Sequence, residues 1–553
     1  MRTHLSLWLA ISAATIGCSD DGKEDSGAVG EGEGEGEGEG EGEGEGEGEG
    51  EGEGEGEGET IDPRFTDLAA AVEADIRGSN ATGAQVAVWL DGQCHYVGGF
   101  GSASASEDQP VTEDTLFMIG SDTKKITALM ALQQVEQGSL ALDTTIRDVL
   151  PDVDAPYAEP FLDATLHHLL THQGGSADYA DWNTETTDDD LYNTAHSDFG
   201  RNAWSMARPG AFWNYSNPNF SFAGLMDETV SGTYWADRTI SDVAEPLGMA
   251  HTYARKADLE GPVSTGMGLS GQFDTSIGPV DFEDHWETAF VRPAGLVWST
   301  ATDQCKLAEF LLHGDETILS ADLHAELVAP HVELYPDLPG QYGYGLFFNQ
   351  GGQFGAGAYY DIPIWSHGGN TLTHTSTFYL LPEQDFAIAI LSNGYGDSFV
   401  SSVVTAALTL TELPDPTDPP ASPEVDLDAA AAFVGTYFDE YNVGTVEVTM
   451  GEAGLEVSMP DVDAAGIPYD PALEAVTTHV WAFSIQGTEL DLTFIPGDDG
   501  EAWMRNRAFV ARRAPEAEPA ALARPAAPAD RGQRIQDALL QATLKPVPSP
   551  LSR

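Results

Sequence analysis

Ser121-Asp-Thr-Lys124-Lys-Ile126-Thr-Ala-Leu-Met-Ala-Leu132 is the stretch that says most about how this chain folds. From Ile126 to Leu132 nearly every residue is apolar or small, so a helix here would be apolar almost all round. Such a helix runs through a domain interior. The stretch therefore predicts a buried helix that opens at Ser121, with its first turn at the edge of a sheet.

The first turn of this helix carries a reactive pair of residue types. Residues three apart share a helix face, with Cβ atoms about 5–6 Å apart, so the Lys124 amine can reach the Ser121 hydroxyl. A serine at its ordinary pKa is a poor nucleophile, whereas a partly desolvated lysine can be neutral and remove its proton. Ser-x-x-Lys thus predicts Ser121 as nucleophile and Lys124 as its base.

A simpler interpretation is that Ser121 caps the helix and Lys124 is solvated. The chain has only six lysines, however, and only Lys124 stands three residues after a serine. Its position at the start of the most apolar helix favours the reactive interpretation.

On both sides of this helix, the sequence predicts a mixture of helices and strands. A helix is expected near 65–77 and strands at 84–90, 375–381 and 386–392, with helices between the early and late strands. We therefore predict an α/β domain over 61–412, whose sheet is assembled from both ends with a helical region inserted.

Beyond this domain, residues 413–425 form a proline-rich linker that cannot continue a helix or a central strand. Short β-prone runs within 426–513 predict a small all-β barrel or sandwich domain. The linker suggests few obligatory contacts between the two domains. Residues 514–553 are an Ala/Pro-rich tail.

The N-terminus indicates export. Residues 1–18 form a short apolar segment ending at Cys18, which is typical of a lipoprotein signal peptide and predicts lipid attachment at Cys18. An ordinary signal with an incidental cysteine is the alternative. The acidic Glu-Gly repeat within 19–60 predicts a flexible tether. We expect a lipid-anchored protein of the bacterial cell envelope, at the outer membrane, or a secreted one.

Net charge bears on the possible binding partners, and the cysteine count bears on disulfide bonding. The formal net charge is −68, and without residues 1–60 it is still about −51, so nucleic acid is an unfavourable partner. Cys94 and Cys305 could pair in an oxidising compartment, but two buried thiols are at least as plausible.

Two further motifs follow Ser-x-x-Lys in order: Tyr215-Ser-Asn217 in a loop-like stretch, and His367-Gly368-Gly369 before a late strand. Together they resemble the three motifs of the serine β-lactamase-related family, which includes class C β-lactamases, penicillin-binding DD-peptidases and esterases. The resemblance covers about 65–412. It implies the β-lactamase/DD-peptidase-like fold, in which an antiparallel sheet has flanking helices plus a helical region.

The same resemblance implies a role for each position. Ser121 would attack a carbonyl, Lys124 would accept its proton, and Tyr215 would protonate the leaving group. Asn217 would orient substrate or Lys124, and the amides of Ser121 and Asn370 would form the oxyanion hole. His367 replaces the usual lysine of Lys-Thr-Gly, beside Gly368 and Gly369, and would face a substrate carboxylate or join the relay.

The resulting hypothesis is a serine hydrolase that forms an acyl-enzyme with a D-Ala-D-Ala-like peptide, a β-lactam or a small ester, without metal or other cofactor. The rival is a catalytically silent surface binding protein on the same fold. His168 and His172 have the i, i+4 spacing of zinc ligands but lack the intervening glutamate and a third ligand. A Gly-x-Ser-x-Gly motif is missing, which disfavours an α/β-hydrolase.

Overall fold

A computed structural model describes residues 61–153, 156–178, 185–196, 205–269, 276–355, 357–439, 442–497, 501–507 and 509–514. The predicted signal peptide with Cys18, the tether and nearly all of the C-terminal tail lie outside these ranges. None of the described helices is long and apolar enough to cross a membrane.

The predicted α/β domain over 61–412, the main region, is built on one antiparallel sheet of eight strands, in the order β2-β1-β12-β11-β10-β9-β8-β7. Strand β1 pairs with β12, so the two ends of the region meet in the sheet, as predicted. In chain order the strands are β1 (Gly83–Leu90), β2 (Gln93–Gly101), β7 (Val332–Glu333), β8 (Gln341–Tyr342), β9 (Phe347–Phe354), β10 (Ala358–Asn370), β11 (Thr375–Leu381) and β12 (Phe386–Ser392).

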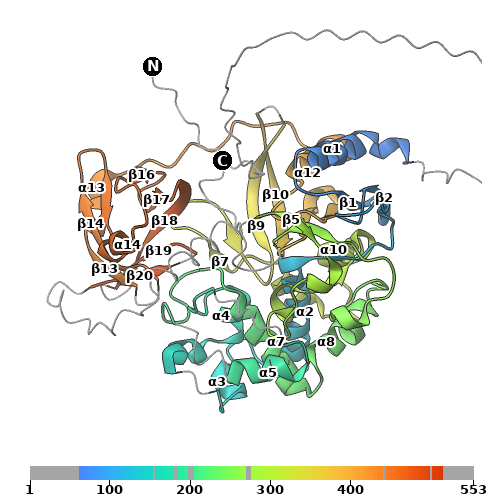
Figure 1. The fold of residues 1–553 in the computed structure, drawn as a ribbon, viewed down its shortest axis with the longest axis horizontal. Helices are drawn as coiled ribbons and strands as arrows, with labels where there is room; N and C mark the ends of the chain where they lie inside the picture. Colours follow the sequence, from blue (N-terminus) through green and yellow to red (C-terminus); the bar gives the residue numbers. More distant parts are fainter. Residues whose placement is uncertain are drawn as a thin grey trace, which may run out of the picture.

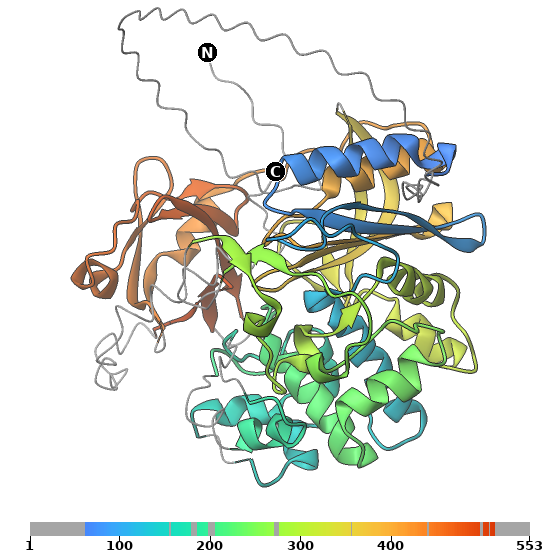
Figure 2. The ribbon, with the colours of Figure 1, turned by 45° about the vertical axis from the view of Figure 1, so that its right-hand side comes forward.

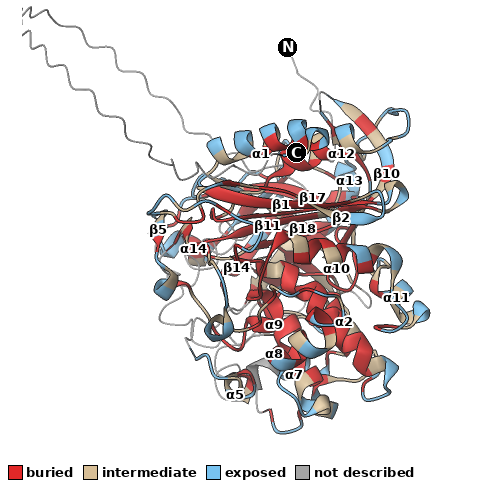
Figure 3. Ribbon diagram, turned by 90° about the vertical axis from the view of Figure 1, so that its right-hand side faces the viewer, coloured by how far each residue is buried: buried red, intermediate tan, exposed pale blue. Residues whose placement is uncertain are grey.

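Helices cover both faces of this sheet. On one face lie α1 (Thr66–Arg77) and α12 (Val400–Leu410), with their outer sides exposed (Figures 1 and 3). On the other face lie α10 (Ala301–His313) and the larger helical region. Because each face buries its own apolar cluster, the sheet is the middle layer of the domain.

The helical region is inserted between β2 and β7. Its helices are α2 (Thr123–Glu136), α3 (Ile146–Val149), α4 (Leu166–Leu170), α5 (Asp189–Thr194), α7 (Asn217–Ser231), α8 (Trp235–Arg238), α9 (Arg292–Gly295) and α11 (Ala321–Leu327). Two small ribbons join β3 (Phe117–Met118) to β6 (Trp298–Ser299) and β4 (Gly266–Gly268) to β5 (Gly278–Val280).

Helix α2 is buried over most of its length, which confirms the prediction from its composition. It begins at Thr123, however, and Ser121 lies in the preceding 3-10 turn Gly120–Asp122. Gly120 has φ +53°, and a Cβ on it would lie 2.6 Å from the backbone nitrogen of Asn370. The chain therefore enters the helix through a tight turn packed against β10, and Ser121 does not cap α2.

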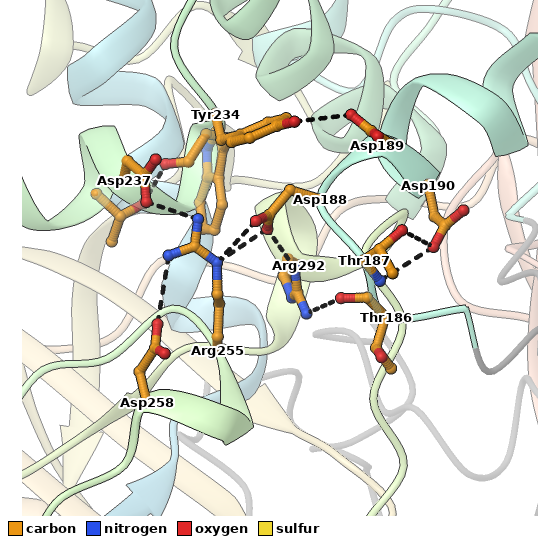
Figure 4. Close-up of polar contacts among 12 residues, drawn as sticks. Thr186, Thr187, Asp188, Asp189, Asp190, Tyr234, Asp237, Arg255, Asp258 and Arg292 are labelled. Atoms are coloured by element: carbon orange, nitrogen blue, oxygen red, sulfur yellow. Dashed lines mark hydrogen bonds and ion pairs between the residues drawn. The ribbon is translucent and has the colours of Figure 1, made fainter.

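Two arginines stabilise the loops of the helical region (Figure 4). Arg255 pairs with Asp188, Asp237 and Asp258, and Arg292 pairs with Asp188 and Glu287. Arg292 is the first residue of α9 and is nearly buried. The shared carboxylate of Asp188 thereby fixes α9, which lies beside α2.

A disulfide joins Cys94 of β2 to Cys305 of α10. From the sequence, a disulfide and two buried free thiols were both possible for these cysteines. The bond ties the edge of the sheet to the helix that packs on it.

The C-terminal region is all-β, as predicted, and lies to one side of the main sheet (Figure 2). Its single sheet has the order β15-β14-β13-β20-β19-β18-β17-β16, and backbone bonds from Val457 and Leu473 bring its two edges close to closure as a barrel. The strands are β13 (Gly435–Asp439), β14 (Gly444–Met450), β15 (Leu455–Ser458), β16 (Glu474–Ala475), β17 (Val480–Ile485), β18 (Thr488–Pro496), β19 (Ala502–Arg505) and β20 (Val510–Arg513), with helices α13 (Leu427–Ala430) and α14 (Pro460–Ala464).

The two regions make more contacts than the proline-rich linker suggested. Val480 of β17 joins an apolar cluster with Trp213 and Tyr342 of the main region. Arg505 donates to the carbonyl of Leu334 at 2.5 Å, and His479 Nδ1 lies 2.7 Å from Asp337. Linker composition describes the connector and not the surfaces that it brings together, so whether any of these contacts is obligatory for folding stays a prediction.

Candidate active site

The Ser121 hydroxyl and the Lys124 amine face each other at the start of α2. Lys124 Nζ lies 2.9 Å from Ser121 Oγ. Lys124 has no exposed surface, whereas Ser121 is half-buried and so remains open to a substrate. The sequence prediction that these two side chains meet is confirmed.

Three oxygens surround the Lys124 amine. Besides Ser121 Oγ, Nζ donates to Asn217 Oδ1 at 2.9 Å and to the carbonyl of Ala294 at 2.7 Å. The last two atoms can only accept hydrogen bonds. A neutral amine that donates both of its N–H groups to them has its lone pair left for the Ser121 hydroxyl proton. This is the arrangement that a general base requires.

Tyr215 lies in the loop immediately before α7 and closes the other side of Ser121. Its side chain hydrogen-bonds with Ser121, and Lys124 Nζ lies 4.8 Å from its ring centroid. Burial raises the pKa of the Tyr215 phenol, and this effect exceeds the lowering by Arg507 and by the Ser121 hydrogen bond. The phenol is therefore protonated at neutral pH, which suits a proton donor.

Asn217 begins α7 and is held by a residue that the motifs did not predict. Asp178 Oδ1 accepts from the Asn217 backbone nitrogen at 2.9 Å and from Nδ2 at 3.1 Å. The other oxygen, Oδ2, accepts from Arg507 of the C-terminal region, whose Nε and Nη2 lie at 2.9 and 2.6 Å. The Asn217 side-chain oxygen thus accepts a hydrogen bond from Lys124, while its side-chain nitrogen donates one to Asp178.

The end of β10 packs directly against Ser121. A Cβ on Gly369 would lie 1.9 Å from the Ile119 carbonyl and 2.7 Å from the Ser121 nitrogen, so only glycine fits there. Gly120 stands equally close to Asn370. These approaches bring the backbone amides of Ser121 and Asn370, the predicted oxyanion donors, into one neighbourhood. Gly368 is less confined, with 3.1 Å between a Cβ and the Ser376 carbonyl.

His367 lies in this neighbourhood, in surroundings that disfavour its charged form. It is buried, and burial together with Lys124 and Lys125 holds the pKa of its imidazole well below 6.5. Its Nδ1 donates to the Gly368 carbonyl at 2.7 Å, which leaves Nε2 to accept from the Tyr342 hydroxyl at 3.2 Å. Desolvation disfavours the imidazolium. Whether His367 faces a substrate carboxylate or joins the relay stays a prediction.

The two histidines with zinc-like spacing do different things. His168 Nδ1 accepts from the Thr165 nitrogen at the start of α4, and His172 packs on Tyr215 with Nδ1 accepting from the Ser216 nitrogen. Within the described residues, no group of three or more His, Cys, Asp or Glu side chains could hold a metal ion.

Asp178, Arg507 and His172 are the site residues that motif reasoning missed. Asp178 directly follows Gly174-Gly-Ser-Ala and lies inside the range 65–412 that the family resemblance covers, but outside its three motifs. Arg507 carries no motif. A basic residue is uncommon in a chain with 23 basic and 91 acidic residues, and this scarcity was the only signal available.

Comparisons with known proteins agree with this geometry. The Beta-lactamase family model matches residues 68–410. Penicillin-binding protein 4 of Amycolatopsis lactamdurans is 27% identical over 375 residues, which cover 64% of this chain and 92% of that protein. Esterase EstB of Burkholderia gladioli is 32% identical over 196 residues, which cover 33% of this chain and 49% of the esterase.

Among solved structures, SurE with D-Leu has a TM-score of 0.61 to this chain at 21% identity. The matched part is 82% of this chain and 99% of the SurE chain. That share is larger than residues 68–410, so the likeness of fold includes the C-terminal β-region. The fold and the family match together define a serine hydrolase. The chain belongs to the Beta-lactamase family.

Proposed function

We propose that this protein is an acyl-transferring hydrolase in which Ser121 forms an acyl-enzyme. The observation that carries the proposal is the convergence on Ser121 Oγ of a buried amine at 2.9 Å and a protonated phenol. A nucleophile, a base and an acid within hydrogen-bond reach of one another are what acyl transfer needs.

In the proposed first step, Ser121 Oγ bonds to the carbonyl carbon of the substrate and its proton passes to Lys124 Nζ. The carbonyl oxygen becomes an oxyanion, which the amides of Ser121 and Asn370 would stabilise. Tyr215 then gives a proton to the leaving nitrogen or oxygen as its bond to the carbonyl carbon breaks, and Lys124 restores the phenol proton. Water, deprotonated along the same path, releases the acid and regenerates Ser121.

The proposed substrates are D-Ala-D-Ala-like peptides, β-lactams and small esters. A penicillin-binding protein and an esterase among the relatives support this range. The lowered pKa of buried His367 supports donors that need no histidine cation, and we propose a small ester as the first of them to test.

The test is covalent labelling of the full-length protein with a fluorophosphonate and with a penicillin, followed by intact-mass and peptide analysis. We expect one adduct, on Ser121, and turnover of at least one of nitrocefin, a p-nitrophenyl ester and a D-Ala-D-Ala peptide. The Ser121→Ala protein is the control. A wild-type protein with no adduct and no turnover would instead support a silent binding protein.

We further propose an extracytoplasmic location, with the protein tethered to the cell envelope through lipid on Cys18 or secreted. The apolar segment before Cys18 and the acidic repeat after it support the tether. The disulfide between Cys94 and Cys305 is also typical of an oxidising compartment.

A further inference from the structure

The Arg507 side chain of the C-terminal β-region contacts the proposed catalytic residue Tyr215. Arg507 follows β19, and its guanidinium carbon lies 4.6 Å from the Tyr215 ring centroid. Its ion pair with Asp178 joins residues 329 positions apart, and the two side chains are only 15% and 8% exposed. This pair is therefore a shielded contact, unlike an exposed surface pair.

The pair is the outer end of a continuous series of polar contacts. Arg507 donates to Asp178 Oδ2, Asp178 Oδ1 accepts from Asn217, and Asn217 Oδ1 accepts from Lys124, which faces Ser121. In these contacts Oδ2 accepts from the guanidinium and Oδ1 accepts from the amide.

This arrangement decides which way the Asn217 amide points. In the opposite orientation, Nδ2 would face the Lys124 amine and Oδ1 would face the Asp178 carboxylate, two mismatched contacts. Asp178 prevents that orientation as long as it is a fixed carboxylate. Removing Arg507 takes a cation away from this shielded carboxylate, which favours its protonation or its movement toward water.

We propose that Arg507 is a positioning residue: the C-terminal β-region fixes Asp178 through it, and Asp178 holds the Asn217 oxygen on Lys124. The inference rests on the proposed function, since it concerns how the proposed base is oriented. It makes the catalytic site depend on both regions of the chain, although the three motifs all lie in one of them.

The test uses the full-length protein and Arg507→Gln, which keeps much of the side chain's length but removes its charge. We expect kcat for a p-nitrophenyl ester, and the rate of fluorophosphonate labelling, to fall about 10- to 100-fold with KM little changed, because a small misplacement of a catalytic group costs this much. Arg507→Lys should recover part of the loss. If Arg507→Gln does not fold, Arg507→Lys alone should still show a lower kcat at unchanged KM.

His479→Ala is the matched control. It removes another contact between the same two regions, the 2.7 Å pair with Asp337, which has no bond to Asn217. We expect it to lower the melting temperature about as much as Arg507→Gln while kcat stays within about twofold. Equal losses of kcat in both variants would show a merely structural role and overturn the proposal.

A double-mutant cycle tests the route through Asp178. In Asp178→Asn there is no charge for Arg507 to balance, so adding Arg507→Gln should change kcat by less than about twofold. Multiplying losses would overturn the proposal, as would a wild-type kcat in Arg507→Gln. These outcomes differ from failure of the proposed function, in which the wild-type protein itself is neither labelled nor active and this inference falls with it.

Discussion

The imidazole of His172 packs against the phenol ring of Tyr215, with 4.1 Å between the ring centroids. His172 is fully buried, has φ +56°, and accepts a hydrogen bond from the Ser216 nitrogen at 3.2 Å. One residue thus supplies both a packing surface for Tyr215 and an acceptor for the backbone beside it.

Two substitutions separate these roles. His172→Phe keeps a ring but leaves the Ser216 nitrogen without this acceptor, so we expect a loss of about 1–3 kcal/mol in unfolding free energy with kcat largely kept. His172→Asn can restore the acceptor and tolerates positive φ, but it removes the ring, so kcat should fall about tenfold or more. Urea unfolding and steady-state ester hydrolysis measure the two effects. Equal kcat in both variants would mean that ring packing does not position Tyr215.

Ser121 and Lys124 should behave as one unit. Ser121→Ala and Lys124→Ala are each expected to reduce kcat by at least about a thousandfold, and the double variant should be little worse than either, because nucleophile and base act in the same step. Melting temperatures should show that the Ser121→Ala protein stays folded. Losses that multiply in the double variant would indicate that Lys124 does not serve Ser121.

The local parts of this structure were predictable, whereas the long-range parts were not. The bounds of β11 and β12 match the sequence prediction because both are buried apolar runs and the turn Pro382–Asp385 separates them. Ser121 and Lys124 meet because they are three residues apart on one short segment. Asp178 and Arg507 meet only through the packing of two regions, which no local pattern encodes.

The pKa of His367 also depends on long-range packing and could not be predicted from the local motif. The motif shows that a histidine stands there, but it does not show that burial, together with Lys124 and Lys125, lowers the pKa of its imidazole. An unperturbed imidazole with a pKa near 6.5 would have predicted a cation in mildly acidic solution.

His367 should therefore cause no change in substrate affinity with pH near neutrality. Its lowered pKa means that it loses its proton below pH 6.5, so KM for a carboxylate-bearing substrate should be flat between about pH 6 and 8 as far as His367 is concerned. His367→Gln should give a profile of the same shape. A rise in wild-type KM over this range that His367→Gln abolishes would restore the cationic role.

Cys18 should decide membrane association. Replacing it by serine removes the proposed site of diacylation, so the protein should move from the detergent phase to the aqueous phase in a Triton X-114 partition. Metabolic labelling with a fatty-acid analogue should be lost in parallel. If the variant still partitions into detergent, the attachment lies elsewhere in the chain.

The last prediction concerns a second lysine directly beneath the site. Lys125 Nζ lies 2.5 Å from Asp122 Oδ1, and both side chains are essentially buried. Asp122 also accepts a hydrogen bond from Ser376 of β11, so the pair ties the start of α2 to the sheet. Desolvation raises the pKa of Asp122 and lowers that of Lys125 to about 8.

Lys125→Met should be strongly destabilising, by about 3–5 kcal/mol, because it leaves a buried carboxylate without its cation. Asp122→Asn should cost less, since a lysine whose pKa is already about 8 can become neutral with little penalty at pH 7. The double variant should then be more stable than Lys125→Met alone. In Lys125→Met, the pKa of the Asp122 carboxyl is higher in the folded than in the unfolded protein. Stability should therefore be greatest at low pH and fall as the pH rises above the unfolded pKa, which is near 3.9. Unfolding curves at pH 4, 6 and 8 measure this slope, and a Lys125→Met protein that is equally stable at all three would show that Asp122 finds another partner.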